Sequence, residues 1–174
     1  MKYFPIPVAI FWLLTFFFFP NAHAQLQVGE KIPGFITSTL DGKRIALKEY
    51  WEQTGKKAMV LSFFATWCQP CKEDLQYLQK VQDQHGALGL QVLCVLTQDT
   101  SKEDAVKKFM QGLGVRLPVL LDENGIIGKR YGVIGLPCNF VIDGERVLKA
   151  KYLGYSEAVR RDFEGRLKGL LSIP

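Results

Sequence analysis

The sequence predicts a single α/β domain whose mixed sheet has helices on both faces. Continuous apolar runs over 57–65 and 90–96 indicate strands buried on both faces, as in a mostly parallel sheet. Amphipathic stretches follow these runs, and such an alternation of strands and helices favours parallel pairing. The dipeptides Asp41–Gly42 and Asp143–Gly144 each predict a hairpin turn, so we expect antiparallel strands at the edges.

The first half of the chain supplies most of this pattern. β-prone residues predict a strand over 35–40 and a returning strand over 44–47, followed by a short helical turn over 48–53. Apolar residues at helical spacing predict a helix from about Pro70 to His85, where Gly86 is a suitable terminator.

The second half continues the alternation. Thr100 or Ser101 is expected to cap a helix with acidic residues in its first turn. The elements expected after it are a strand over 117–121, a short helix over 126–131, hairpin strands over 138–142 and 146–152, and an amphipathic helix over 156–171.

Composition suits one domain with a core of its own. The chain has 174 residues, 48% of them hydrophobic, and a formal net charge of +5. Its basic residues are interleaved with acids, as in Lys102–Glu103–Asp104, and form no basic stripe with aromatic residues. We therefore expect no nucleic-acid partner.

The N-terminus has the features of a secretory signal peptide over 1–24. An apolar run over 6–19 follows a positive start, and Ala22–His23–Ala24 fits the small-x-small rule for cleavage after position 24. The run is too short to span a bilayer comfortably, although an uncleaved anchor is the alternative. The domain over 25–174 is then exported, into the periplasm in a Gram-negative cell, and meets the membrane only if the segment stays uncleaved.

The motif Trp67–Cys68–Gln69–Pro70–Cys71 lies where a buried strand ends and a helix begins. The first turn of a helix has unpaired N–H groups and a partial positive charge, which favour a thiolate over a thiol. We therefore interpret Cys68 as a nucleophile. Cys71, one turn into the helix, is close enough to form a disulfide with it.

This motif, followed much later by Gly135–Leu136–Pro137, resembles the thioredoxin fold, and more narrowly the TlpA/ResA-like thiol–disulfide oxidoreductases. The segment 28–43 resembles that family's N-terminal hairpin, and 113–122 resembles its central insertion. The loop and strand over 131–143 resemble those that carry its cis-proline. Together these segments cover nearly all of the mature chain.

The resemblance implies an enzyme of the protein-disulfide reductase type. Cys68 would attack a substrate disulfide, and Cys71 would resolve the mixed disulfide. Trp67 would flank the bound peptide. Pro137, if cis, would bring the backbone of Leu136 against Cys68 to pair with an extended substrate.

Gln69–Pro70 would support the motif, with Pro70 stiffening its turn and the pair tuning its potential. No cofactor is implied beyond the redox-active disulfide. The implied partners are disulfide-bearing exported proteins, as in cytochrome c maturation. Because the compartment is oxidising, a reducing role also implies a membrane electron donor.

Other functions and sites are compatible with parts of this pattern. They are a disulfide oxidant or isomerase, a peroxiredoxin-like thiol peroxidase, and a redox-inert peptide-binding module. A zinc site is not expected, because Cys94, Cys138 and His85 are not spaced as a second ligand pair. Lys72 stands where a c-type haem site needs histidine.

Three positions depart from the family pattern. Ser62 replaces the buried aspartate of cytoplasmic thioredoxins, and Gln76 replaces a helix proline, with Asp74 on the preceding family glutamate. Cys138 stands where the residue after the cis-proline is commonly threonine or similar. The proton acceptor for Cys71 is left open, and we interpret its candidates as solvated surface carboxylates: Glu73, Asp74 and Asp99.

The two cysteines outside the motif are expected to stay unpaired. Cys94 is interpreted as a small core residue in its strand, and strands flanking a common neighbour would hold it about 10 Å from Cys138. Cys138 follows Pro137 directly. It is either a buried packing residue or a third thiol that modulates the exchange.

Overall fold

The computed structural model describes residues 25–172. The predicted signal peptide over 1–24 lies outside the described residues and is not tested by them. Within 25–172, none of the helices is both long enough and apolar enough to cross a membrane.

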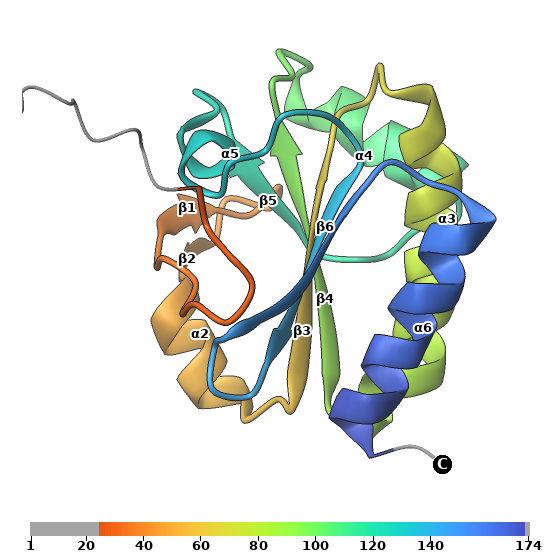
Figure 1. Ribbon diagram of the computed structural model, residues 1–174. Coiled ribbons are helices and arrows are strands. Elements are labelled where there is room, and N and C mark those ends of the chain that lie inside the picture. The colour runs from red at the N-terminus through yellow and green to blue at the C-terminus, as the bar shows by residue number, and fades with distance from the viewer. Residues whose placement is uncertain (1–24, 173–174) are drawn as a thin grey trace, which may run out of the picture.

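A five-stranded mixed sheet forms the centre of the domain (Figure 1). Its strand order is β5 (Val119–Asp122), β4 (Leu90–Thr97), β3 (Ala58–Phe64), β6 (Cys138–Asp143) and β7 (Leu148–Leu153). The pairs β3–β4 and β4–β5 are parallel, whereas β3–β6 and β6–β7 are antiparallel. The predicted mixed sheet is therefore confirmed.

Helices cover both faces of this sheet (Figure 1). One face packs against α3 (Gln69–His85) and α6 (Glu157–Leu171), together with α4 (Glu103–Gly112). The opposite face packs against α2 (Leu47–Thr54) and α5 (Ile126–Arg130). A single 3₁₀ turn, η2 (Gly86–Leu88), joins α3 to β4.

The predicted N-terminal hairpin is present, but it does not add a strand to the edge of the main sheet. Its strands, β1 (Ile36–Ser38) and β2 (Arg44–Ala46), form a separate two-stranded sheet. An isolated bridge between Thr39 and Leu120 and a hydrogen bond from the Leu40 N–H tie it to β5. The Thr37 hydroxyl also donates to the backbone oxygen of Leu121 on β5. Because β1 and β2 have three residues each, they offer too few backbone N–H and C=O groups for a longer row of hydrogen bonds to β5.

The C-terminal hairpin forms an antiparallel edge of the sheet, and the strands of Cys94 and Cys138 flank β3, both as predicted. β6 lies inside the sheet and runs antiparallel to β3, with Cys138 opposite Phe63. The loop before β6 therefore reaches the same end of the sheet at which β3 stops. This direction places Pro137 at the end of the sheet where the cysteine motif begins.

The predicted cap of α4 is wrong. Its N-cap residue is Lys102, which makes no side-chain capping hydrogen bond, rather than Thr100 or Ser101. The Ser101 backbone N–H donates instead to Asp99, and its hydroxyl lies 3.1 Å from that of Thr66. Ser101 thus stabilises the loop beside the cysteine motif.

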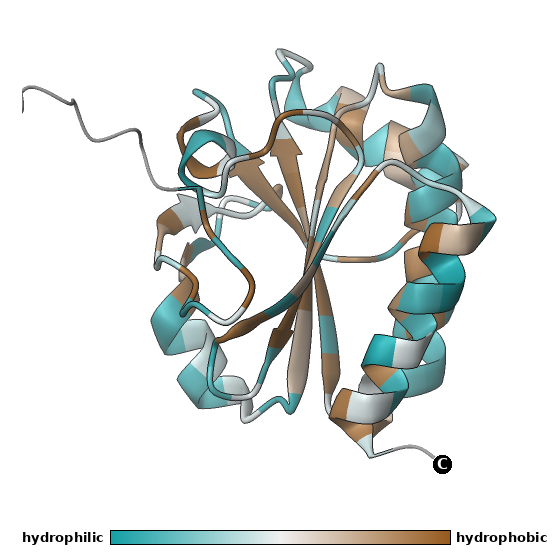
Figure 2. Cartoon of the chain, in the orientation of Figure 1, coloured by the Kyte–Doolittle hydropathy of each residue, from teal (hydrophilic) through white to brown (hydrophobic). Residues whose placement is uncertain are grey.

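Burial is greatest along β3, whose seven residues are all buried. Its alternate side chains belong to two hydrophobic clusters, one on each face of the sheet. Figure 2 shows the strands as the hydrophobic layer and the helices with hydrophilic residues on their outer surfaces. Burial on both faces of β3 confirms the interpretation of its continuous apolar run.

Replacing Phe163 by alanine should destabilise the fold by about 3–5 kcal/mol, because a large buried ring leaves a cavity. Phe163 is 2% exposed, and its ring centroid lies 5.9 Å from Tyr77 and 5.7 Å from Tyr152. Denaturant unfolding of the oxidised protein measures the loss. As a control, Leu88→Ala at a 46% exposed position should change stability by less than about 0.5 kcal/mol. Equal losses in the two variants would contradict this assignment of the core.

Candidate functional site

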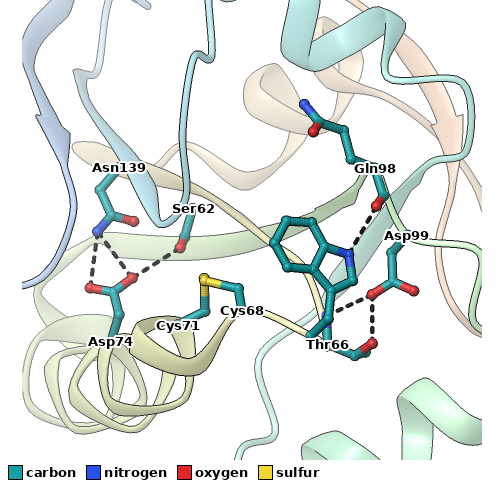
Figure 3. The surroundings of a disulfide bond; sticks show 9 residues. Ser62, Thr66, Cys68, Cys71, Asp74, Gln98, Asp99 and Asn139 are labelled. Atoms are coloured by element: carbon teal, nitrogen blue, oxygen red, sulfur yellow. Dashed lines mark hydrogen bonds between the residues drawn. A yellow bond between two sulfur atoms is a disulfide. The ribbon is translucent and has the colours of Figure 1, made fainter.

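Cys68 and Cys71 form a disulfide at the start of α3, with their Cα atoms 5.3 Å apart (Figure 3). Cys68 is the N-cap residue of the helix, and Cys71 lies in its first turn. Cys68 is 5% exposed, whereas Cys71 is fully buried. Between them, Gln69 and Pro70 are exposed in the first helical turn.

The local electrostatics favour a thiolate at Cys68. The first turn of α3 contains no acidic residue, so no carboxylate there opposes the positive end of the helix dipole. Since Cys68 precedes this 17-residue helix, its sulfur can be stabilised by the helix dipole and the free N–H groups. The more exposed cysteine is therefore also the one that the helix activates.

Asp74 is buried, which corrects the interpretation of this residue as a solvated surface carboxylate. It is only 2% exposed. Because it lies three residues after Cys71 in α3, the two side chains share one helix face, and Figure 3 shows Asp74 beside the disulfide. Burial raises the pKa of Asp74 to about 6, while hydrogen bonds from Asn139 and Ser62 act to lower it.

A polar row crosses the sheet beneath the start of α3. Ser62 lies opposite Cys94 on β4 and opposite Asn139 on β6. The Ser62 hydroxyl donates to Asp74 at 3.4 Å, and Nδ2 of Asn139 donates to both carboxylate oxygens, at 3.0 and 3.1 Å (Figure 3). Asp74 on α3 thus places a carboxyl group next to Ser62, the strand position at which cytoplasmic thioredoxins carry a buried aspartate.

The sequence reasoning missed Asn139 and the burial of Asp74. Two periodicities could have revealed them. The spacing of three from Cys71 places Asp74 on the buried helix face, and strand alternation places Asn139 on the face opposite Cys138 and Phe140. Both residues break an otherwise apolar pattern.

A second polar cluster fixes the loop before Cys68. Asp99 accepts hydrogen bonds from the backbone N–H and the hydroxyl of Thr66, both at 2.6 Å, and from the backbone N–H of Ser101 at 2.8 Å. Burial acts to raise the pKa of Asp99, but these hydrogen bonds outweigh it and hold the pKa below its ordinary value. Asp99 is therefore a loop anchor.

Exposed apolar side chains lie in the motif and at the end of the sheet where the motif begins. Trp67 is 64% exposed, and its indole Nε1 donates to the backbone oxygen of Gln98 at 3.1 Å. Two exposed residues that we had not predicted are Ile134 and Leu153, at 77% and 50%. A Cβ on Gly135 would lie 3.2 Å from Leu153 Cδ1, so the loop before β6 packs against the end of β7.

The Leu136–Pro137 peptide bond is cis, as the resemblance implies. The backbone oxygen of Pro137 accepts a hydrogen bond from the Gly154 N–H at 2.8 Å, which links this loop to β7. Leu136 is half-buried and packs against both hydrophobic clusters. Its side chain thus helps to hold the loop in place.

The two other cysteines are free and fully buried, as predicted. Cys94 belongs to the cluster that also contains Cys71, and burial followed by the charge of Asp74 raises the pKa of its thiol. Cys138 packs in the opposite cluster with Phe63 and Phe140, and burial raises its pKa to about 11. This placement favours the packing interpretation of Cys138 over that of a third reactive thiol.

No site for a metal ion is visible in the part of the chain that the structure describes. Over 25–172, no group of three or more histidine, cysteine, aspartate or glutamate side chains is arranged to hold one. The groups that the structure places at the disulfide include its two sulfurs, the buried Asp74 carboxyl group and the backbone amides at the start of α3.

Comparison with known proteins matches residues 28–151 to the AhpC/TSA family. The chain is 33% identical over 119 residues to the thiol–disulfide oxidoreductase ResA of Bacillus thuringiensis subsp. konkukian, a match that covers 68% of this chain and 65% of that protein. It is 31% identical over 144 residues to ResA of B. thuringiensis Al Hakam, with 83% and 79% covered.

Among solved structures, the chain is similar to the crystal structure of a protein described as the thiol:disulfide interchange protein DsbE from Chlorobium tepidum. The TM-score is 0.75 at 27% identity, and the alignment covers 84% of this chain and 99% of that one. An uncharacterised thioredoxin-like protein from Porphyromonas gingivalis aligns with a TM-score of 0.67 at 28% identity, with 81% and 92% covered. The thioredoxin fold predicted from the sequence is confirmed.

Asp99→Ala should lower the free energy of unfolding by about 1 kcal/mol at neutral pH, because the Thr66 and Ser101 donors lose their acceptor. Since the folded-state pKa of Asp99 is depressed, its stabilisation is present above the unfolded value of about 3.9. It should be lost as the pH falls through the folded pKa. Denaturant unfolding of both proteins from neutral to acidic pH measures this difference, with the exposed Glu123→Ala as control. A pH-independent difference would contradict the assignment.

Cys138→Ala should leave the rate of thiol–disulfide exchange within about twofold, because its side chain packs on the face opposite Cys71. Stability should fall by about 1 kcal/mol through loss of a small buried group. Stopped-flow exchange with a model disulfide and denaturant unfolding measure the two effects. A mixed disulfide trapped on Cys138 would show that the thiol takes part.

Proposed function

The chain belongs to the AhpC/TSA family, as a thioredoxin-fold relative of the ResA thiol–disulfide oxidoreductases, and on this premise we propose that it is an exported protein-disulfide reductase. The observation that carries the proposal is the Cys68–Cys71 disulfide at the start of α3, with the buried Asp74 carboxyl group on the same helix face. The disulfide is the only redox group that this activity requires.

The proposed reaction begins with the reduced pair. The Cys68 thiolate, stabilised by the helix start, attacks one sulfur of a substrate disulfide and forms a mixed disulfide. Cys71 then transfers its proton to Asp74 and attacks Cys68. The Cys68–Cys71 bond forms, and the bond from Cys68 to the substrate breaks, with its electron pair leaving on the substrate sulfur.

Asp74 suits the second step because its pKa of about 6 lies close to neutrality. Most of the group is ionised at pH 7 and can accept a proton from a nearby thiol. Since Cys71 is fully buried, bulk water is a poor acceptor for its proton. A carboxylate on the same helix face avoids that difficulty.

The proposed substrates are polypeptides with apolar residues beside a disulfide. The exposed side chains of Trp67, Ile134 and Leu153 offer apolar contacts around the motif. The backbone of Leu136, before the cis bond, would pair with an extended substrate strand. Such contacts would orient a substrate disulfide toward Cys68.

Export and the reducing direction are parts of the same proposal. The composition of residues 1–24 supports secretion, with cleavage after Ala24, into the periplasm if the cell is Gram-negative. An exported reductant needs electrons from outside the oxidising compartment, so we propose a membrane protein as donor and exported proteins, such as apocytochromes c, as acceptors.

Cys71→Ser should trap substrates on Cys68, because the mixed disulfide can form but has no thiol to resolve it. The variant is expressed in the exported compartment, and the trapped partners are identified by mass spectrometry. Recovery of apocytochromes and of a membrane donor is expected. The Cys68→Ser/Cys71→Ser double variant is the control and should trap nothing.

Two outcomes would overturn this proposal. If Cys71→Ser traps no protein and the wild type fails to reduce insulin, the enzymatic assignment is wrong. If redox titration gives a potential well above about −200 mV, the protein is an oxidant or isomerase rather than a reductant.

A further inference from the structure

Asn139 is the principal partner of the Asp74 carboxyl group. Its Nδ2 lies 3.0 and 3.1 Å from the two carboxylate oxygens, whereas the Ser62 hydroxyl lies 3.4 Å from one of them. Asn139 and Asp74 are each 2% exposed, so water does not compete readily for these hydrogen bonds. A bond to a charged acceptor is about twice as strong as one between neutral groups.

The other end of the Asn139 amide has no partner within the described residues. Its Oδ1 atom is buried and accepts no hydrogen bond. Leaving a buried acceptor unpaired is costly, so such an atom in a folded protein calls for an explanation. Because Asn139 Oδ1 lies beside a carboxyl group that can gain a proton, it can accept a hydrogen bond from the protonated form of that group.

The two protonation states of Asp74 require opposite partners. The carboxylate only accepts hydrogen bonds, whereas the protonated acid donates one. An amide carries both a donor and an acceptor, and a half-turn of its planar group exchanges them. Asn139 can therefore bind the carboxylate through Nδ2 and the acid through Oδ1.

We propose that Asn139 is a positioning residue for thiol–disulfide exchange, which orients the Asp74 carboxyl group toward Cys71 and stabilises it both before and after it accepts the Cys71 proton. This inference rests on the proposed function, since it assigns a role in the step that resolves the mixed disulfide.

The S–H bond of Cys71 breaks, and its proton forms an O–H bond on Asp74. The Cys71 thiolate then attacks the Cys68 sulfur, and the substrate sulfur leaves with the bonding electron pair. The protein dithiol loses two electrons to the substrate disulfide. The proton on Asp74 is held by Asn139 Oδ1 until it leaves for solvent.

Few other charges face Asp74. The titratable groups around it are the thiols of Cys71 on its own helix, Cys94 on β4 and Cys138 on β6, and Lys151 acts on the Cys138 thiol. None of the ion pairs formed within 25–172 includes Asp74. With no cation paired to the carboxylate there, the Asn139 amide is its main stabilising contact.

Asn139→Leu keeps the shape of the side chain and removes both its donor and its acceptor. Loss of the bond to the charged carboxylate outweighs loss of the weaker bond to the neutral acid, so the pKa of Asp74 should rise by about one unit, a tenfold change in proton affinity. The reduced protein is mixed by stopped flow with an aromatic disulfide that releases a coloured thiolate. The first release reports attack by Cys68, and the second reports resolution by Cys71.

In the wild type, the second phase should accelerate as the pH rises through about 6, where Asp74 ionises. In Asn139→Leu the same rise should occur about one pH unit higher, and the first phase should keep its pH dependence. Ser62→Ala, which removes the longer contact, should shift the profile less.

Gln79→Leu is the matched control. Gln79 is another buried amide of α3, 8% exposed, whose Nε2 donates to a carboxylate oxygen of Asp83 at 2.8 Å, two turns beyond Asp74. It should lose stability without shifting the second phase. An equal shift in Gln79→Leu and Asn139→Leu would overturn the proposal, because the effect would then be one of general destabilisation. An unchanged profile in Asn139→Leu would also overturn it.

A second measurement does not depend on enzymatic activity. The carboxyl carbon of Asp74 is titrated by NMR in protein labelled at aspartate, with the signal assigned by its loss in Asp74→Asn. A higher pKa in Asn139→Leu supports the inference, and an equal pKa overturns it. If the wild type performs no exchange at all, the proposed function fails, while this titration still decides whether Asn139 controls the ionisation of Asp74.

Discussion

The complete burial of β3 is the constraint on which the rest of the structure depends. Ala58–Phe64 lies between a parallel neighbour and an antiparallel one, and its side chains pack into a separate cluster on each face. A strand held on both edges and both faces cannot shift its register without exposing apolar surface. The point at which the chain leaves the sheet is therefore fixed. Cys68 caps α3 just beyond that point.

The same register determines what lies beneath the disulfide. Ser62 interrupts the apolar run of β3 on the face that α3 covers, and its cross-strand neighbour Asn139 places a second polar group beside it. Asp74 reaches both from the buried face of the helix. A carboxyl group at this depth needs such donors, because an unpaired buried charge is strongly destabilising. The polar row and the buried acid thus depend on each other.

The two sulfurs consequently have different surroundings. Cys68 borders the solvent at a helix start without acidic residues, which favours its charged form. Cys71 is buried on the helix face that carries Asp74, so its ionisation requires a proton acceptor close by. One helical turn therefore separates a sulfur at the solvent border of the helix start from a buried sulfur on the face that carries a carboxyl group. The cluster of Asp99 and Thr66 holds the preceding loop in position.

The sequence by itself determined the mixed α/β fold, the location of the motif and the boundaries of most elements to within a few residues. These features follow from local signals: continuous apolar runs, Asp–Gly turns and the periodicity of helices. Tertiary structure alone decided the separation of the N-terminal hairpin from the main sheet.

Tertiary structure also decided the chemical surroundings of the disulfide. Asp74 looks like a surface acid in a polar stretch of helix, and Asn139 looks like an isolated polar residue in a strand. Their proximity arises only when β6 pairs with β3 beneath α3, across 65 residues of sequence. Periodicity can place a residue on a face, but the partner of a buried carboxylate depends on which elements the fold brings together. The sequence therefore identified the two cysteines of the disulfide, and the fold placed a buried carboxyl group and its hydrogen-bond donors beside them.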